Sequence, residues 1–190
     1  MRLFAREINR GDPQDVYAAE HSTVAARLLL HLGLTRNWSF QLGDVVQAFL
    51  LAEIPADKRN VVVVPPNGLV DEGELWRLQR ALYGLRQSPR VWSEHLAQIM
   101  GEISFTRLAN EPQLYVHRDD KGVIDALVVV HVDDFLLTAA PTRMKEFRTL
   151  IESKVPMKWP DVIDEQHWAT FLGRQYRLHG SGILIRAVEG

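Results

Sequence analysis

The sequence predicts a mixed α+β domain in which strands and helices form one compact unit. Three observations lead to this fold class. Short apolar runs bounded by Gly, Pro, Asn or Asp are typical of strands. Longer segments place apolar residues at helical spacing behind Ser or Pro start signals. Two stretches in the C-terminal half carry the turn residues of β-hairpins. The chain has 190 residues, which is enough for one domain with a hydrophobic core.

The helices are predicted from apolar periodicity and from their start signals. Residues 22–37 begin with Ser-Thr and continue with apolar residues at helical spacing. Residues 88–103 begin with Ser-Pro, and proline is favoured at the first helical position. Shorter helices are expected over residues 45–53, which Pro55 closes, and over residues 141–153.

The strands are predicted from alternating or continuous apolar runs. Prolines stop one of these runs, and a Gly-Ser-Gly turn lies inside the last of them. The expected extended segments are residues 38–45, 60–66, 73–82, 113–117, 123–132, 135–140 and 170–188.

Composition excludes several classes of protein. The chain has no cysteine, so any metal must be held by oxygen or imidazole. Its apolar runs are shorter than the roughly 18–20 residues of a spanning helix, and its start lacks the apolar core of a signal peptide. We therefore expect no membrane partner and a cytoplasmic or nuclear location. A net charge of −2 gives no global argument for nucleic-acid binding.

Two adjacent carboxylates, Asp133 and Asp134, stand between apolar runs in VVVHVDDFLLTAA (residues 128–140). Burying a carboxylate costs several kcal/mol unless it is paired, and two together repel each other. A bound cation is the usual remedy. The pair Asp119-Asp120 differs, because an arginine and a lysine flank it and a glycine follows, as in a solvated turn. An exposed turn is the alternative for residues 133–134 as well.

A third carboxylate, Asp44, follows a strand-like segment in QLGDVVQAFL. Two-metal phosphoryl-transfer chemistry places two cations about 3.5–4 Å apart, and it needs ligands from more than one strand. A carboxylate at a strand end can face a cleft rather than the core. The alternative for Asp44 is an N-cap of the following short helix, where Asp is favoured.

Three segments occur in the order found in the copia-type retrotransposon reverse transcriptases, which this chain resembles. They are DVVQAF (44–49), LYGLRQSPRVW (82–92) and HVDDFLL (131–137). Residues 16–38 resemble the helix that precedes the first catalytic strand of that family, and TFLGRQY (170–176) resembles its primer-contacting hairpin. The resemblance covers nearly the whole chain.

This resemblance implies the fold and the reaction. The fold would be a reverse-transcriptase palm, an antiparallel sheet with helices on one face, with partial fingers. Residues 1–190 would form one fragment of that domain, ending at the primer-grip-like hairpin. The activity would be RNA-directed DNA polymerisation on an RNA or DNA template. A primer 3′-hydroxyl would attack the α-phosphate of a deoxynucleoside triphosphate and release pyrophosphate.

The resemblance also implies the catalytic and metal-binding residues. Asp44 and Asp133 would be the principal metal ligands, with Asp134 beside them and the backbone carbonyl of Val45 as a further ligand. Such an oxygen-only set suits two Mg²⁺ ions, which Mn²⁺ could replace. One ion would lower the pKa of the primer hydroxyl, and both would stabilise the developing charge.

Nucleotide contacts are implied in the same way. The ring of Phe49 would lie against the sugar and leave no room for a 2′-hydroxyl, which would select deoxynucleotides. A core aromatic on its short helix is the alternative. Tyr83 and Arg86 would line the nucleotide side, and Arg2 and Arg6 would bind the triphosphate.

Nucleic-acid contacts are expected in three places: the LYGLRQSPRVW block, the catalytic turn and the closing hairpin. Around the first, residues 74–94 hold four arginines against two glutamates, although a solvated face is the alternative. His131 stands where the family usually has tyrosine. The expected contacts are Arg86, Gln87, Ser88, Pro89, Arg90, His131, Leu172 and Gly173.

Three classes of function remain open on the sequence. The first is the polymerase domain, and the second is a decayed, catalytically weak nucleic-acid-binding remnant of the same fold. The third is another metal-dependent phosphodiester enzyme. No acidic ribonuclease H cluster and no integrase segment is recognisable, so these partners are expected elsewhere in a polyprotein. Virus-like particles are then a further location.

Overall fold

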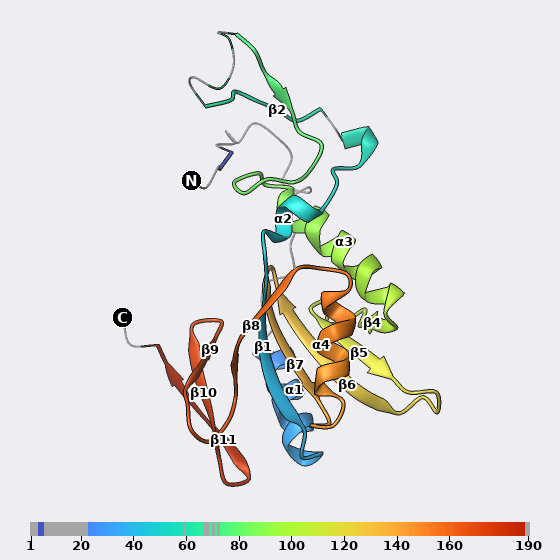
Figure 1. The fold of residues 1–190 in the computed structure, drawn as a ribbon, viewed down its shortest axis with the longest axis vertical. Coiled ribbons are helices and arrows are strands. Elements are labelled where there is room, and N and C mark those ends of the chain that lie inside the picture. The colour runs from blue at the N-terminus through green and yellow to red at the C-terminus, as the bar shows by residue number, and fades with distance from the viewer. Residues whose placement is uncertain are drawn as a thin grey trace. The chain divides into compact units, whose positions relative to one another are not determined.

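The computed structural model describes residues 4–5, 23–58, 60–66, 69, 71 and 73–188 (Figure 1). The predicted triphosphate contacts Arg2 and Arg6 lie outside these described residues. Among the helices that are described, every one is too short or too polar to cross a bilayer.

The described elements confirm a mixed fold of helices and antiparallel strands. The helices are α1 (Thr23–Thr35), α2 (Ala48–Leu51), α3 (Ser88–Glu102) and α4 (Met144–Glu152), with a 3₁₀ turn at Ala56–Lys58. The strands are β1 (Ser39–Val45), β2 (Val62–Val63), β3 (Trp76–Arg77), β4 (Phe105–Arg107), β5 (Leu114–Arg118), β6 (Ile124–His131), β7 (Asp134–Ala139), β8 (Met157–Val162), β9 (Ala169–Phe171), β10 (Arg174–His179) and β11 (Gly182–Ala187).

The chain divides into two compact units by its internal contacts. The first unit takes residues from 1–18 and 47–96, and the second takes residues from 19–46 and 97–190. The chain passes between them at residues 18–19, after β1 and within α3. None of the three crossings has the Pro-, Gly- or Ser-rich composition of a linker, so composition does not reveal the division.

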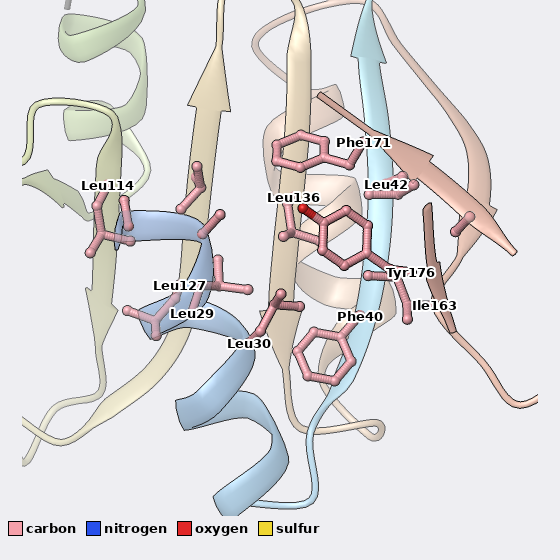
Figure 2. Packing of buried hydrophobic residues seen from close by; sticks show 14 of the residues in the cluster. Leu29, Leu30, Phe40, Leu42, Leu114, Leu127, Leu136, Ile163, Phe171 and Tyr176 are labelled. Atoms are coloured by element: carbon pink, nitrogen blue, oxygen red, sulfur yellow. The ribbon is translucent and has the colours of Figure 1, made fainter. Parts of the chain in front are cut away.

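The second unit is built on a six-stranded antiparallel sheet with the strand order β4-β5-β6-β7-β1-β8. Helix α1 and the three-stranded sheet β11-β10-β9 pack on one face and bury the main hydrophobic core (Figure 2). This core includes Leu29, Leu30, Phe40, Leu42, Leu114, Leu127, Leu136, Phe171 and Tyr176.

Helix α4 covers the opposite face of the same sheet (Figure 1). Its Phe147 is fully buried, with ring contacts to Phe105 at 5.8 Å and to His117 at 4.9 Å. The expectation of helices on one face only is therefore wrong. The physical reason is visible in β7, where every residue from Phe135 to Ala139 is buried. A strand that is apolar on both sides must be covered on both sides.

Several predicted elements differ in extent from the observed ones. Helix α2 is only four residues long, because Gln47 before it is left-handed (φ 58°) and Ala52 after it is extended. Strands β2 and β3 have two residues each. The sequence missed β4 and β8. Strand β8 carries Pro160, which cannot donate a backbone hydrogen bond, and this suits its place at the edge of the sheet.

Candidate active site

A row of polar residues runs across four neighbouring strands of the six-stranded sheet. Asp44 in β1 is the direct cross-strand partner of Asp134 in β7. Asp134 in turn faces His131 in β6, and Asp44 faces Lys158 in β8. Directly opposed residues point to the same side of a sheet, with Cβ atoms about 4.5–5.5 Å apart. The structure therefore brings Asp44 next to the Asp133-Asp134 turn.

The turn between β6 and β7 is tight and strained. His131 pairs with Asp134, so only Val132 and Asp133 form the loop. Val132 has a φ of 57°, which is unfavourable for a β-branched residue. The backbone oxygen of Asp133 accepts a hydrogen bond from the Val45 N–H at 2.8 Å. This bond fixes the end of β1, with Asp44 and Val45, to the carboxylate-bearing turn.

Strand β8 pairs with β1 on the edge of β1 that faces away from β7. The register between β1 and β8 shifts between Leu42 and Asp44. A Cβ atom on Gly43 would lie 2.7 Å from the side chains of both Met157 and Trp159, so glycine is needed for this close approach. The sequence did not indicate this support, because β8 lacks the pattern of a strand.

The three carboxylates interact electrostatically. Burial, and then the charges of Asp133 and Asp44, raise the pKa of Asp134 above its usual value to about 6. A cation would relieve this repulsion, and carboxylate oxygens with the Val45 carbonyl are ligands that Mg²⁺ accepts. Over the described part of the chain, no three Asp, Glu or His side chains already stand in a metal-holding arrangement. Metal binding would therefore have to draw the carboxylates together.

This raised pKa predicts a pH-dependent cost to the metal-free fold. The folded chain keeps the Asp134 proton up to about pH 6, whereas the unfolded chain releases it near pH 4. As the pH rises from about 4 to about 6, the free energy of unfolding therefore falls by the contribution of this group. Allowing for partial exposure, we expect Asp134→Asn to raise the free energy of unfolding by about 1–2 kcal/mol at pH 7 in EDTA. Urea titrations at pH 7 and pH 4 measure this, and an equal effect at both pH values would contradict it.

The second Asp-Asp pair lies on an ordinary turn, as expected. The Asp119 carboxylate accepts hydrogen bonds from the N–H groups of Lys121 (2.9 Å) and Val123 (2.8 Å). This turn joins β5 to β6 at the end of β6 that is remote from His131. The eight residues of β6 separate the two turns by about 26 Å.

In the first unit, Phe49 and Tyr83 lie together. Phe49 is 8% exposed, and its ring centroid is 4.7 Å from that of Tyr83 at an angle of 53°. The segment after α2 is held by hydrogen bonds from the N–H of Ile54 to Gln79 and from the N–H of Ala81 to Ala52, both 2.9 Å. This burial leaves the core interpretation of Phe49 open beside the predicted sugar contact.

Gly84 is required next to Tyr83. It has a φ of 91°, and a Cβ atom there would lie 2.0 Å from the backbone oxygen of Ala5. The N–H of Ala5 donates to the Tyr83 oxygen at 2.7 Å. The Tyr-Gly pair in LYGLRQSPRVW therefore has a structural reason for its glycine.

The side chain of Ser88 closes the loop in front of α3. Its hydroxyl is fully buried, donates to the Leu82 oxygen at 2.7 Å and accepts from the Leu82 N–H at 3.2 Å. The predicted nucleic-acid contact of this side chain does not follow from such a placement. Arg90 forms an ion pair with Glu94 at 3.0 Å on the surface. Arg86, Gln87 and Pro89 are partly exposed.

The predicted primer-contacting turn is a two-residue hairpin loop between β9 and β10. Phe171 pairs with Arg174, and both loop residues are left-handed, with φ values of 49° for Leu172 and 69° for Gly173. These angles fit a type I′ turn. Gly173 is exposed, whereas Leu172 is partly buried against the core of the second unit.

Comparison with known proteins gives consistent matches along the chain. A family model described as reverse transcriptase (RNA-dependent DNA polymerase) matches residues 5–187. The Pol polyprotein from transposon RE1 of Arabidopsis thaliana is 31% identical over 144 residues, which are 72% of this chain and 9% of that protein. The corresponding RE2 polyprotein is 30% identical over 148 residues, 74% of this chain and 10% of that protein. A transposon Ty5-1 protein of Saccharomyces cerevisiae is 36% identical over 102 residues, 52% of this chain and 31% of that protein.

Proposed function

Because this chain belongs to the reverse transcriptase family of copia-type retrotransposons, we propose that it extends a primer as an RNA-directed DNA polymerase. The observation that carries the proposal is the direct pairing of Asp44 with Asp134, beside Asp133 in the strained turn. These carboxylates come from separate segments of the chain, as two-metal phosphoryl transfer requires.

In this proposal Asp44, Asp133 and the Val45 carbonyl hold two Mg²⁺ ions, or Mn²⁺ in their place, with Asp134 beside them. When bound, such ions lower the pKa of a primer hydroxyl and neutralise the charge that develops on the transferred phosphate. The sheet contributes rigidity. The bond from Val45 to Asp133 and the buried apolar strands fix the backbone that carries the carboxylates, so that only their side chains would have to move onto a metal.

The two units fit a palm and a part of the fingers. We assign the unit with the six-stranded sheet as the palm, and the unit that contains α2, β2 and β3 as partial fingers. Residues 1–190 would together form one reverse transcriptase domain fragment.

Substrate contacts are proposed on both units. Phe49, Tyr83 and Arg86 would contact the incoming nucleotide, together with Arg2 and Arg6. The partly exposed Arg86, Gln87, Pro89 and Arg90, before and at the start of α3, would contact the template strand. On the palm, His131, Leu172 and Gly173 would contact the primer. The exposed Gly173 in its type I′ turn lets a nucleic-acid backbone approach closely, because it has no side chain.

The chain spans about a tenth of the length of the RE1 and RE2 polyproteins that it matches. Those relatives are named Pol polyproteins, which supports the proposal that this chain works beside other polyprotein segments. Ribonuclease H and integrase segments are the expected neighbours. The proposed setting is the cytoplasm or nucleus, or virus-like particles within them.

A primer-extension assay on poly(rA)·oligo(dT) tests the function. We expect extension of the primer by dTTP with Mg²⁺ or Mn²⁺, and its complete loss in EDTA. Binding of the same duplex in EDTA, measured by fluorescence anisotropy, is the companion experiment. Duplex binding without extension in either metal would support the catalytically weak remnant instead.

A further inference from the structure

A small cavity lies in the second unit between α1 and the sheet β11-β10-β9, away from the row of carboxylates. Its volume is about 160 Å³. Its apolar wall includes Leu30 from α1 and Ile185 from β11, and its polar groups come from Thr23, Arg27, Arg174 and Tyr176. Leu30 and Tyr176 can be seen in Figure 2. The predicted active site uses none of these six residues.

Two positively charged side chains line this cavity. Arg27 comes from α1 and Arg174 from β10, and both guanidinium groups are close enough to act on the Tyr176 hydroxyl. Burial raises the pKa of Tyr176, and the charges of Arg174 and Arg27 oppose that rise. Both arginines are exposed, and within the described residues neither side chain makes a hydrogen bond, an ion pair or a ring contact. No carboxylate of the described residues therefore neutralises either charge.

The other two arginines of this sheet already have partners. On its outward face, Arg177 and Arg186 stack on the ring of Trp168, with guanidinium-to-centroid distances of 4.8 and 4.1 Å. Arg186 also donates to the Gln175 side chain at 2.7 Å. Residues 168–188 contain no Asp or Glu, so the sheet supplies no internal counter-ion. The cavity face of the sheet differs, because Arg174 on that face has no side-chain partner among the described residues and lines the cavity together with Arg27.

We propose that this cavity binds a small organic anion that has a carboxylate or phosphate head and an apolar body of about one ring. Arg27 and Arg174 would hold the oxyanion, since guanidinium groups bind both heads through paired hydrogen bonds. The hydroxyls of Thr23 and Tyr176 can donate to the same oxygens. A cavity of about 150 Å³ accommodates benzene, which sets the size of the body against Leu30 and Ile185.

The proposal stands apart from the polymerase function, since it names a separate site that needs no metal and no nucleotide. Leu172 also lines the cavity, and it belongs to the turn for which primer binding is proposed. A bound ligand would therefore contact that turn from its buried side.

The test is a titration of the complete chain in EDTA with benzoate, phenyl phosphate or toluene, followed by methyl NMR shifts of Leu30, Leu172 and Ile185. We expect saturable shifts with at least one of the two anions, and the tighter of the two identifies the head group. Toluene has the ring without the charge and should bind at least about tenfold more weakly. Equal binding of toluene, or no saturable shift with either anion, would overturn the proposal.

Single substitutions distinguish binding by the cavity arginines from a general effect of the protein's net charge. Arg27→Gln and Arg174→Gln should each weaken anion binding about tenfold or more. Arg177→Gln is the matched control, because it makes the same charge change on the same strand but on the opposite face. Its affinity should stay within about twofold of the parent. An equal loss in Arg177→Gln would mean that only net charge matters, and the cavity assignment would fail.

A nucleic-acid backbone could supply the same phosphate chemistry. Adding a short DNA duplex to the phenyl phosphate complex distinguishes the two sources. The small-anion proposal expects the methyl shifts to persist. Their reversal by the duplex would assign the arginines to a backbone phosphate and overturn it. Asp133→Asn should leave anion binding unchanged, so a failure of the polymerase proposal would not affect this result.

Discussion

Asp133→Asn should abolish primer extension while the chain still binds its primer duplex. The substitution keeps the size of the side chain but removes the negative charge that would ligate a metal ion. Loss of such a ligand costs several kcal/mol of transition-state stabilisation, so we expect extension to fall by at least about a thousandfold. The measurements are extension of oligo(dT) on poly(rA) and duplex affinity in EDTA.

Asp119→Asn is the matched control for this prediction. It makes the same chemical change in the other Asp-Asp pair, at the opposite end of β6. The amide oxygen of asparagine can still accept the hydrogen bonds from Lys121 and Val123, so the turn should persist. Extension by Asp119→Asn should match the parent. A similar loss in both variants would indicate a general effect of charge or stability rather than a metal site.

Phe49→Val should change the preference for deoxynucleotides over ribonucleotides, and it should leave the metal-dependent transfer step in place. If the Phe49 ring blocks C2′, truncation opens space there without touching the carboxylates. Ribonucleotide incorporation should then rise relative to deoxynucleotide incorporation by about tenfold or more, because sterically excluded groups are rejected by a few kcal/mol. The measurement is the ratio of kcat/KM for dTTP and UTP, together with a melting curve.

The structure supplies a control for this variant too. Phe4 also contacts the ring of Tyr83, at 6.2 Å, but it is 64% exposed. Phe4→Val should therefore remove an aromatic contact to Tyr83 and leave the sugar ratio unchanged. If Phe49 is only a core aromatic, Phe49→Val should instead cost about 3–5 kcal/mol and impair both nucleotides alike. An unchanged ratio of kcat/KM for the two nucleotides, together with a much lower melting temperature, would show that Phe49 is a core aromatic.

The elements that the sequence predicted well are those with strong local patterns. The capped, periodic segments became α1 and α3, and the apolar runs around Asp133 became β6 and β7. Strand β8 was missed because its contacts with β1, and not its own residues, make it a strand. The burial of Ser88 was missed because its hydroxyl bonds to the backbone of Leu82, a contact that no apolar pattern indicates.

By itself the sequence determined that two adjacent carboxylates stand between apolar strands, that the chain lacks thiolate ligands, and which family its motifs match. Only the tertiary structure decided where Asp44 lies. Side chains alternate between the two faces of a strand, so a slip of one residue between β1 and β7 would turn Asp44 toward α4 and away from Asp134. The bond from Val45 to Asp133 and the close approach at Gly43 fix the register that places them together. These contacts join residues distant in sequence, and a local pattern cannot encode them.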